Sequence, residues 1–171
     1  MKTQFFFLAL LLIGATAYTQ LNSPATTAIG ECDPAEAGND QAPAPLSDRE
    51  LIEDAIKRFM RGGDESDLDA LQAVLHDQFR VVVNQGVLGG DALRTVDKGT
   101  YLNMISAKKW GGVPRTVNIV SISIAGTIAS AEVQTSSVRS DMTSFLHVVK
   151  EKNGQWLVVG DTPFPVAKKA K

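Results

Sequence analysis

The 171-residue chain is poor in the residue types on which several kinds of functional site depend. It contains a single cysteine, Cys32, and two histidines, His76 and His147. One cysteine excludes an intramolecular disulfide, and these three residues lack the spacing of a zinc site. No Lys-Ser or Lys-Thr pair follows the glycines in residues 85–93, which excludes a phosphate-binding P-loop. We therefore predict no metal and no cofactor.

The charge balance gives no sign of a nucleic-acid partner. Lys and Arg together number 17 and Asp and Glu 19, for a formal net charge of −2. No basic stretch alternates with aromatic residues, which are only 6% of the chain. The apolar run at residues 5–13 is too short to span a bilayer, and no other run approaches that length. We predict neither nucleic-acid binding nor a membrane segment after removal of the N-terminus.

The first 45 residues have the composition of a leader followed by a linker. Lys2 precedes the apolar run, and a stretch of small residues ending at Ala17 follows it, a pattern typical of a secretory signal peptide (residues 1–17). We therefore predict cleavage after Ala17 and export to the periplasm or the extracellular space. Residues 18–45, rich in Ala, Pro, Thr and Gly, are predicted to be a disordered linker. The alternatives for residues 1–17 are a buried helix and a membrane anchor. Cys32 is expected to be a free thiol in a flexible leader, and a lipid on Cys32 is the alternative.

Helical patterns dominate the next part of the chain. Ser47 and Glu50 have the spacing of a capping box, and apolar residues follow from Leu51 to Met60 with helical periodicity. Gly62-Gly63 is predicted to end this helix with a left-handed cap. The further elements predicted are a short helix opened by Ser66 or Asp67, a strand over Phe79–Asn84 and a helix from Asp97 to about Lys109.

The last third of the chain is typical of antiparallel strands. Its segments are rich in Val, Ile, Thr and Phe and are separated by turn signals. The predicted strands are Val113–Ile124, Thr127–Ser137, Met142–Lys152 and Gln155–Thr162. Helices first and a strand meander afterwards predict an α+β domain over residues 46–165, with the helices packed on a curved, mainly antiparallel sheet. Residues 166–171 are predicted to be a basic tail.

The final hairpin has a definite predicted register. A two-residue Asn153-Gly154 turn pairs His147 with Gly160 and Val149 with Val158. Opposed residues share a face. One face then carries Phe145, His147, Val149, Trp156, Val158 and Gly160, and the other carries Leu146, Val148, Leu157, Val159 and Asp161. Because both faces are largely apolar, we expect the helices to cover one and a second subunit to cover the other. Asp161 is assigned to the face of the partner or solvent.

Several local patterns resemble the nuclear transport factor 2-like superfamily, and most of all its putative lumazine-binding group. They are Gly62-Gly63-Asp64 after a capped helix, Leu75-His76-Asp77-Gln78-Phe79 after a short one, and the hairpins within Ile122–Ala131 and Phe145–Val159. The resemblance covers about residues 48–164. It implies a cone-shaped α+β barrel, a pocket between the helices and the concave sheet, and a homodimer through the sheet. It also implies a small organic ligand, which the group name suggests is lumazine- or flavin-like.

Enzymes of this superfamily carry an acidic base on the strand after the second helix or on later strands. The corresponding first strand here ends in Val83-Asn84. Neither side chain can take a proton from carbon, so an isomerase of that type is not expected.

The candidate pocket residues are His147, Tyr101, Trp110 and Asn84. A histidine facing Gly160 has room beside it and titrates near neutral pH, so His147 could bind a ligand or act as an acid or base; alternatively, it is a core histidine bonded to a carbonyl. Tyr101 and Trp110 offer aromatic surface at a pocket mouth or in the core. We favour an exported, non-catalytic small-molecule-binding or accessory protein. The alternatives are an isomerase, dehydratase or hydrolase using His147, and a dimeric interaction module without a ligand.

Overall fold

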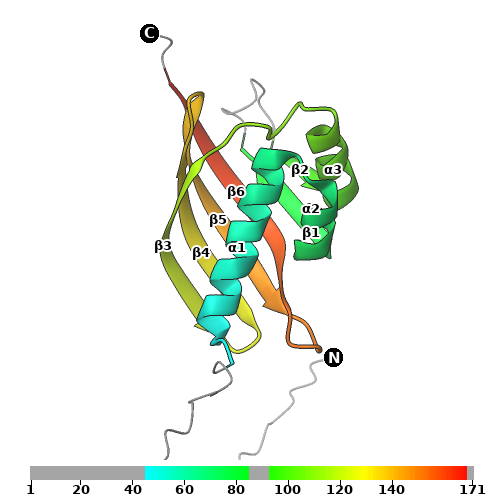
Figure 1. Cartoon of the computed structure of the whole chain (residues 1–171), viewed down its shortest axis with the longest axis vertical. Helices are drawn as coiled ribbons and strands as arrows, with labels where there is room; N and C mark the ends of the chain where they lie inside the picture. Colours follow the sequence, from blue (N-terminus) through cyan, green and yellow to red (C-terminus); the bar gives the residue numbers. More distant parts are fainter. Residues whose placement is uncertain (1–44, 85–92, 169–171) are drawn as a thin grey trace, which may run out of the picture. The chain divides into compact units, whose positions relative to one another are not determined.

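A computed structural model describes residues 45–84 and 93–168, which form three helices and six strands (Figure 1). The helices are α1 (Asp48–Glu65), α2 (Leu68–Val74) and α3 (Lys98–Ser106). The strands are β1 (Leu75–Val83), β2 (Arg94–Asp97), β3 (Thr116–Ala125), β4 (Ile128–Ser136), β5 (Ser140–Lys150) and β6 (Trp156–Ala167). The predicted signal peptide, nearly all of the linker and the end of the basic tail lie outside the described residues. Those assignments and the domain limits stay predictions.

The strands form one mixed sheet in the order β2-β1-β6-β5-β4-β3. Neighbouring strands are antiparallel except β1 and β6, which pair in parallel. The predicted α+β class with a mainly antiparallel sheet is confirmed, although β2 and β3 are edges and the sheet does not close into a barrel. None of the described helices is long and apolar enough to cross a membrane.

Helix α1 begins as the capping box predicts. The Glu50 amide donates to Ser47 Oγ at 3.3 Å, and the Ser47 amide donates to Glu50 Oε2 at 2.8 Å. The predicted end at Gly62-Gly63 is wrong, because the helix continues to Glu65 and the left-handed cap is Ser66, with φ 57°. The glycines serve close packing instead. A Cβ on Gly62 would lie 2.9 Å from Leu71 Cγ, so its absence lets α2 approach α1.

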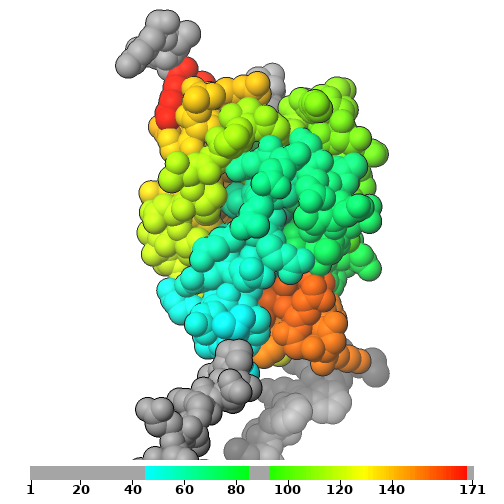
Figure 2. All heavy atoms as spheres, in the orientation of Figure 1, coloured from blue at the N-terminus to red at the C-terminus, as the bar shows by residue number. Residues whose placement is uncertain are grey.

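The hydrophobic core lies between α1 and one face of the sheet, called the inner face below. Figure 1 shows α1 running along this face, and in the space-filling view α1 and α2 cover much of it (Figure 2). Fully buried side chains come from both layers and include Ile52, Ile56, Met60, Leu71, Phe79, Leu146 and Val148. Apolar burial of this kind contributes about 25 cal/mol for each Å² removed from water.

A β-bulge in β6 changes which residues of the last hairpin face inward. The turn contains Lys152 in addition to Asn153-Gly154, because the Glu151 amide donates to the Gln155 carbonyl at 2.8 Å. Val149 therefore pairs with Leu157, one residue from the predicted partner. The bulge beyond Val148 then restores the predicted pair of His147 with Gly160.

The two shifts reverse part of the predicted face assignment. Before the bulge, Trp156 and Val158 face inward; after it, Asp161 does so, opposite the buried Leu146. The prediction that Asp161 faces a partner or solvent is wrong. His147 lies on the outer face, so the prediction of an interior histidine is wrong as well. The physical reason is that one extra residue in a strand inverts the alternation of every later side chain.

The loop after α3 packs on the end of α1 through Gly111 and Gly112. The Gly112 amide donates to the Gly63 carbonyl at 3.0 Å. Gly111 has φ +68°, and a Cβ there would lie 2.2 Å from the Gly63 carbonyl oxygen. This position therefore needs glycine both for its backbone angle and for the space.

Gly111→Ala should destabilise the protein more than Gly126→Ala. Gly126 has a similar φ of +63° but no atom within 4 Å of a Cβ, so its substitution should cost only the backbone strain of about 1–2 kcal/mol. Gly111→Ala should lower the free energy of unfolding by a further ~1–3 kcal/mol, because the loop must leave α1. Urea unfolding measures both. Equal losses would show that the loop is not tightly packed.

Candidate functional site

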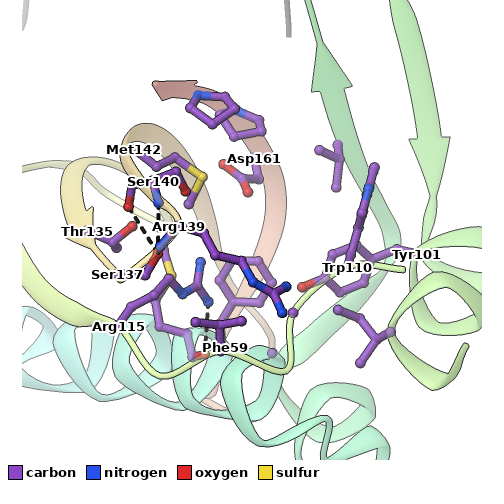
Figure 3. Close-up of a pocket in the computed structure, with 18 of the residues that line it drawn as sticks. Phe59, Tyr101, Trp110, Arg115, Thr135, Ser137, Arg139, Ser140, Met142 and Asp161 are labelled. Atoms are coloured by element: carbon purple, nitrogen blue, oxygen red, sulfur yellow. Dashed lines mark hydrogen bonds between the residues drawn. The ribbon is translucent and has the colours of Figure 1, made fainter. Parts of the chain in front are cut away.

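A cavity of about 310 Å³ lies between the end of α1, α3 with its following loop, and the inner face of the sheet (Figure 3). Its walls are largely apolar and include Phe59, Val81, Val83, Ile105, Trp110 and Met142. Its polar lining includes Tyr101, Lys109, Arg115, Thr135, Arg139 and Asp161. An apolar cavity with a few polar groups is the usual form of a small-molecule site.

Asp161 is the buried carboxyl group of the cavity. Only 7% of the residue is exposed, and its Oδ1 has no hydrogen-bond partner among the described residues. Burial raises the pKa of Asp161 to about 7, while the Ser144 hydroxyl and the positive charge of Arg115 limit the rise. Near neutral pH the carboxyl group is therefore present in both its charged and its neutral form.

Asp161 belongs to a line of three buried polar side chains, which we call the polar row: Thr135 on β4, Ser144 on β5 and Asp161 on β6. The three adjacent strands place them diagonally on the inner face, because Val133 pairs with Ser144 and Leu146 with Asp161. Within the described part of the chain, none of their buried oxygens Oγ1, Oγ and Oδ1 has a partner at hydrogen-bonding geometry, although the Ser144 hydroxyl is near enough to the Asp161 carboxyl group to lower its pKa. An unpaired buried polar group costs about 1–3 kcal/mol, so the polar row is suited to hydrogen-bonding a bound molecule.

Tyr101 brings a protonated phenol to the same cavity. Its ring lies 5.3 Å from that of Phe79 and 5.9 Å from that of Trp110. Burial, together with the negative charge of Asp161, raises the pKa of Tyr101. Its hydroxyl group therefore remains a hydrogen-bond donor throughout the physiological pH range.

The cations of the lining differ in how they are paired. Arg115 Nε lies 2.5 Å from Asp64 Oδ1, and Arg115 Nη2 donates to the Met60 carbonyl at 3.1 Å. Lys109 and Arg139 are exposed and form no ion pair within residues 45–84 and 93–168. Figure 3 shows the Arg139 side chain extending into the cavity.

The residues proposed from the sequence fall in different places. Tyr101 and Trp110 line the cavity. His147 does not, and its Nδ1 lies 3.0 Å from Ser130 Oγ on the outer face. Asn84 follows the end of β1 with an exposed side chain and is not part of the cavity lining.

The sequence analysis assigns Asp161 to the wrong face and does not single out Thr135, although one signal for the position of Asp161 is present. A glycine inside a strand often marks a bulge, and Gly160 directly precedes Asp161. The sequence analysis treats Gly160 only as space for the His147 side chain. A bulge at this point would have moved the single carboxylate of an apolar strand to the inner face.

Fold and cavity together define an α+β protein of the nuclear transport factor 2-like class, with a hollow between its helices and its sheet. A family described as "Putative lumazine-binding" matches residues 47–162, and the chain belongs to this family. The resemblance predicted from the sequence is thereby confirmed. None of the curated proteins compared with the chain matches it.

Solved structures share the fold at low sequence identity. An NTF2-like protein of unknown function from Shewanella baltica OS155 is 20% identical, with a TM-score of 0.61 over 70% of this chain and 94% of the other. An NTF2-like protein of unknown function from Methylobacillus flagellatus KT is 17% identical, with a TM-score of 0.60 over 72% and 96%. A ketosteroid isomerase-like protein from Erwinia carotovora atroseptica is 12% identical, with a TM-score of 0.57 over 70% and 96%. At these identities, the likeness concerns the fold.

Asp161→Asn should change how stability depends on pH. The folded chain keeps a proton on Asp161 between the ordinary pKa of 3.8 and about 7, where the unfolded chain has lost it. The free energy of unfolding therefore falls as pH rises through this range, by about 1.4 kcal/mol per pH unit from this group. The asparagine variant has no such loss and should exceed the wild type by about 2–4 kcal/mol above neutral pH.

Urea unfolding from about pH 4 to about pH 8 measures this difference. Asp141→Asn is the contrasting variant. Hydrogen bonds from Lys168 and Ser136 lower the pKa of Asp141, so its substitution should cost stability as pH rises. If the free energy of unfolding depends on pH in the same way for Asp161→Asn and the wild type, the carboxyl group is not desolvated.

Proposed function

We propose that the chain is an exported protein that binds a small organic molecule in the cavity without catalysing a reaction on it. The observation that carries this proposal is the polar row: Thr135 and Asp161 line a largely apolar cavity, and their buried oxygens Oγ1 and Oδ1 have no hydrogen-bond partner among the described residues. A ligand with hydrogen-bonding groups on one edge would pair with the oxygens of Thr135 and Asp161 and remove the cost of leaving them unpaired. The export component rests on the sequence of residues 1–17.

The family description supports a flat heterocycle such as lumazine as the type of ligand. A pteridine ring has an apolar face that suits the rings of Tyr101 and Trp110. Its carbonyl and N–H groups suit the hydroxyl of Thr135 and the carboxyl group of Asp161. The cavity of about 310 Å³ is at the lower end of the range of ligand pockets, which favours a compact molecule.

Isothermal titration calorimetry with lumazine, riboflavin and a panel of pterins tests the proposal. We expect at least one of them to bind the wild type, and Thr135→Val to weaken that binding by about tenfold through loss of one buried hydrogen bond. Thr162→Val is the matched control, because Thr162 is exposed on β6 and outside the cavity. No binding across the panel, or equal affinity of Thr135→Val and the wild type, would contradict the proposal.

A second candidate function is proton transfer to or from the bound molecule. The pKa of Asp161 is near 7, where a carboxyl group serves either as general acid or as general base. The role that the sequence analysis gave to His147 would then belong to Asp161. If the wild type converts one of the titrated ligands into a product and Asp161→Asn does not, proton transfer is favoured over simple binding.

We also propose that the outer face of the sheet binds a second copy of the chain. Phe145 on β5 is 52% exposed, and Phe164 on β6 is 61% exposed. Val166 on the same face is exposed as well. Large apolar side chains grouped on one sheet face favour association, and a two-fold axis would let the same patch cover itself.

Phe145→Glu should convert a dimer into a monomer, because it places a charge within the proposed interface. Analytical ultracentrifugation measures the mass of each species. Val138→Glu is the control, since Val138 is 86% exposed between β4 and β5 and should leave the dimer intact. A monomeric wild type would exclude the dimer.

A further inference from the structure

The cationic side chains of the cavity outnumber the acidic side chains that pair with them. Lys109, Arg115 and Arg139 line the cavity, and Asp161 is the one carboxylate in the lining described here. Asp64 already neutralises Arg115. Lys109 and Arg139 thus remain without an ion pair among the described residues, and Asp161, whose pKa is about 7, offsets only part of their positive charge near neutral pH. The excess is local and of the opposite sign to the whole chain.

Arg139 is held by a hydrogen-bonded turn between β4 and β5. Its backbone amide donates to Ser137 Oγ at 3.1 Å, and its carbonyl accepts from the Lys168 amide at 3.0 Å. The Ser140 amide also donates to Ser137 Oγ, at 3.1 Å. With the backbone fixed on both sides, the long side chain extends into the cavity (Figure 3). A guanidinium group presented in this way is suited to a carboxylate or phosphate.

Burial separates the polar groups of the cavity by depth. Thr135 and Asp161 are buried, whereas Lys109 and Arg139 are exposed. The hydrogen-bonding groups therefore lie deep, and the two unpaired cations lie at the mouth. A ligand that satisfies both must carry a hydrogen-bonding edge on its buried part and a negative charge on its outer part.

We propose that the ligand is a compact organic anion whose acidic group lies at the cavity mouth between Arg139 and Lys109, while its ring lies against the polar row. This inference rests on the proposed binding function and specifies its ligand class. The apolar walls select the ring, the polar row selects its hydrogen-bonding edge, and the two cations select the charge. A neutral molecule of the same shape leaves both cations without a partner.

Two matched pairs of ligands test the role of charge: lumazine-6-carboxylate with lumazine-6-carboxamide, and naphthalene-2-carboxylate with naphthalene-2-carboxamide. Each amide keeps the size of its acid and removes the charge. Titration calorimetry on the full chain should show the acid binding about tenfold more tightly than the amide in at least one pair. This preference should decrease as salt concentration rises, because the mouth is exposed to solvent.

Substitutions at the mouth locate the effect. Arg139→Ala and Lys109→Ala should each weaken binding of the acid by about threefold to tenfold and leave the amide unchanged. Arg61→Ala and Lys152→Ala are the matched controls. Both remove an exposed positive charge outside the cavity lining, and they should change neither affinity.

The outcomes separate this inference from the function on which it rests. If the amide binds as tightly as the acid, the cavity binds molecules but the anionic class is wrong. If Arg139→Ala weakens acid and amide equally, the side chain acts by packing, and the inference is again wrong. If neither acid nor amide binds in either pair, the binding function fails for these ring classes and the inference fails with it.

Discussion

The bulge in β6 is the constraint on which the cavity depends. Trp156 and Val158 must face α1 to complete the core, and Asp161 faces the same side only because an extra residue intervenes between Val158 and Gly160. Without the bulge, the side chains of β6 would alternate regularly, and the carboxyl group of Asp161 would lie on the outer face. One irregularity in a single strand therefore separates an apolar core from a polar cavity within one continuous sheet.

Helix α1 is held at both ends, which allows its last turns to form a cavity wall. At its start, Asp48 Oδ1 accepts from Lys150 Nζ at 2.6 Å and from Trp156 Nε1 at 3.1 Å. At its other end, Asp64 binds Arg115 and the Gly63 carbonyl binds the loop after α3. Between these ends, Ile52, Ile56 and Met60 pack in the core, and only the last turns of the helix border the cavity. The helix can thus lie over a hollow without losing its position.

Much of the fold could be predicted from the sequence, because its signals are local. The capping box at Ser47, the apolar stripe of α1 and the turn at Asn153-Gly154 depend on residues close in sequence. Other glycine signals gave wrong predictions, because a glycine can either end a helix or allow close packing. Gly62-Gly63 suited a helix cap by composition, but the chain uses these residues for close packing against Leu71 and the loop at Gly111. Local sequence does not contain the position of those distant neighbours.

The site was harder to predict, because it depends on register across several strands. Tyr101 and Trp110 were found from their position beside a helix. Asp161 was assigned to the wrong face and Thr135 was not singled out, because their strands contribute to both faces and a shift of one residue exchanges the faces. His147 was placed in the interior by the same shift. In an antiparallel sheet, the face on which a residue lies can be predicted only if the bulges that precede it in the strand are known.

The buried polar groups of the cavity lower the stability of the folded protein. Burial raises the pKa of Asp161 to about 7, and the buried oxygens of the polar row have no partner among the described residues. A fold selected only for stability would carry apolar side chains of similar volume at these positions, because a buried polar group without a partner destabilises the protein. Their presence together, on three adjacent strands and beside two unpaired cations, supports the proposed binding of a small molecule. Functional sites typically contain such groups, which lower the stability of the fold.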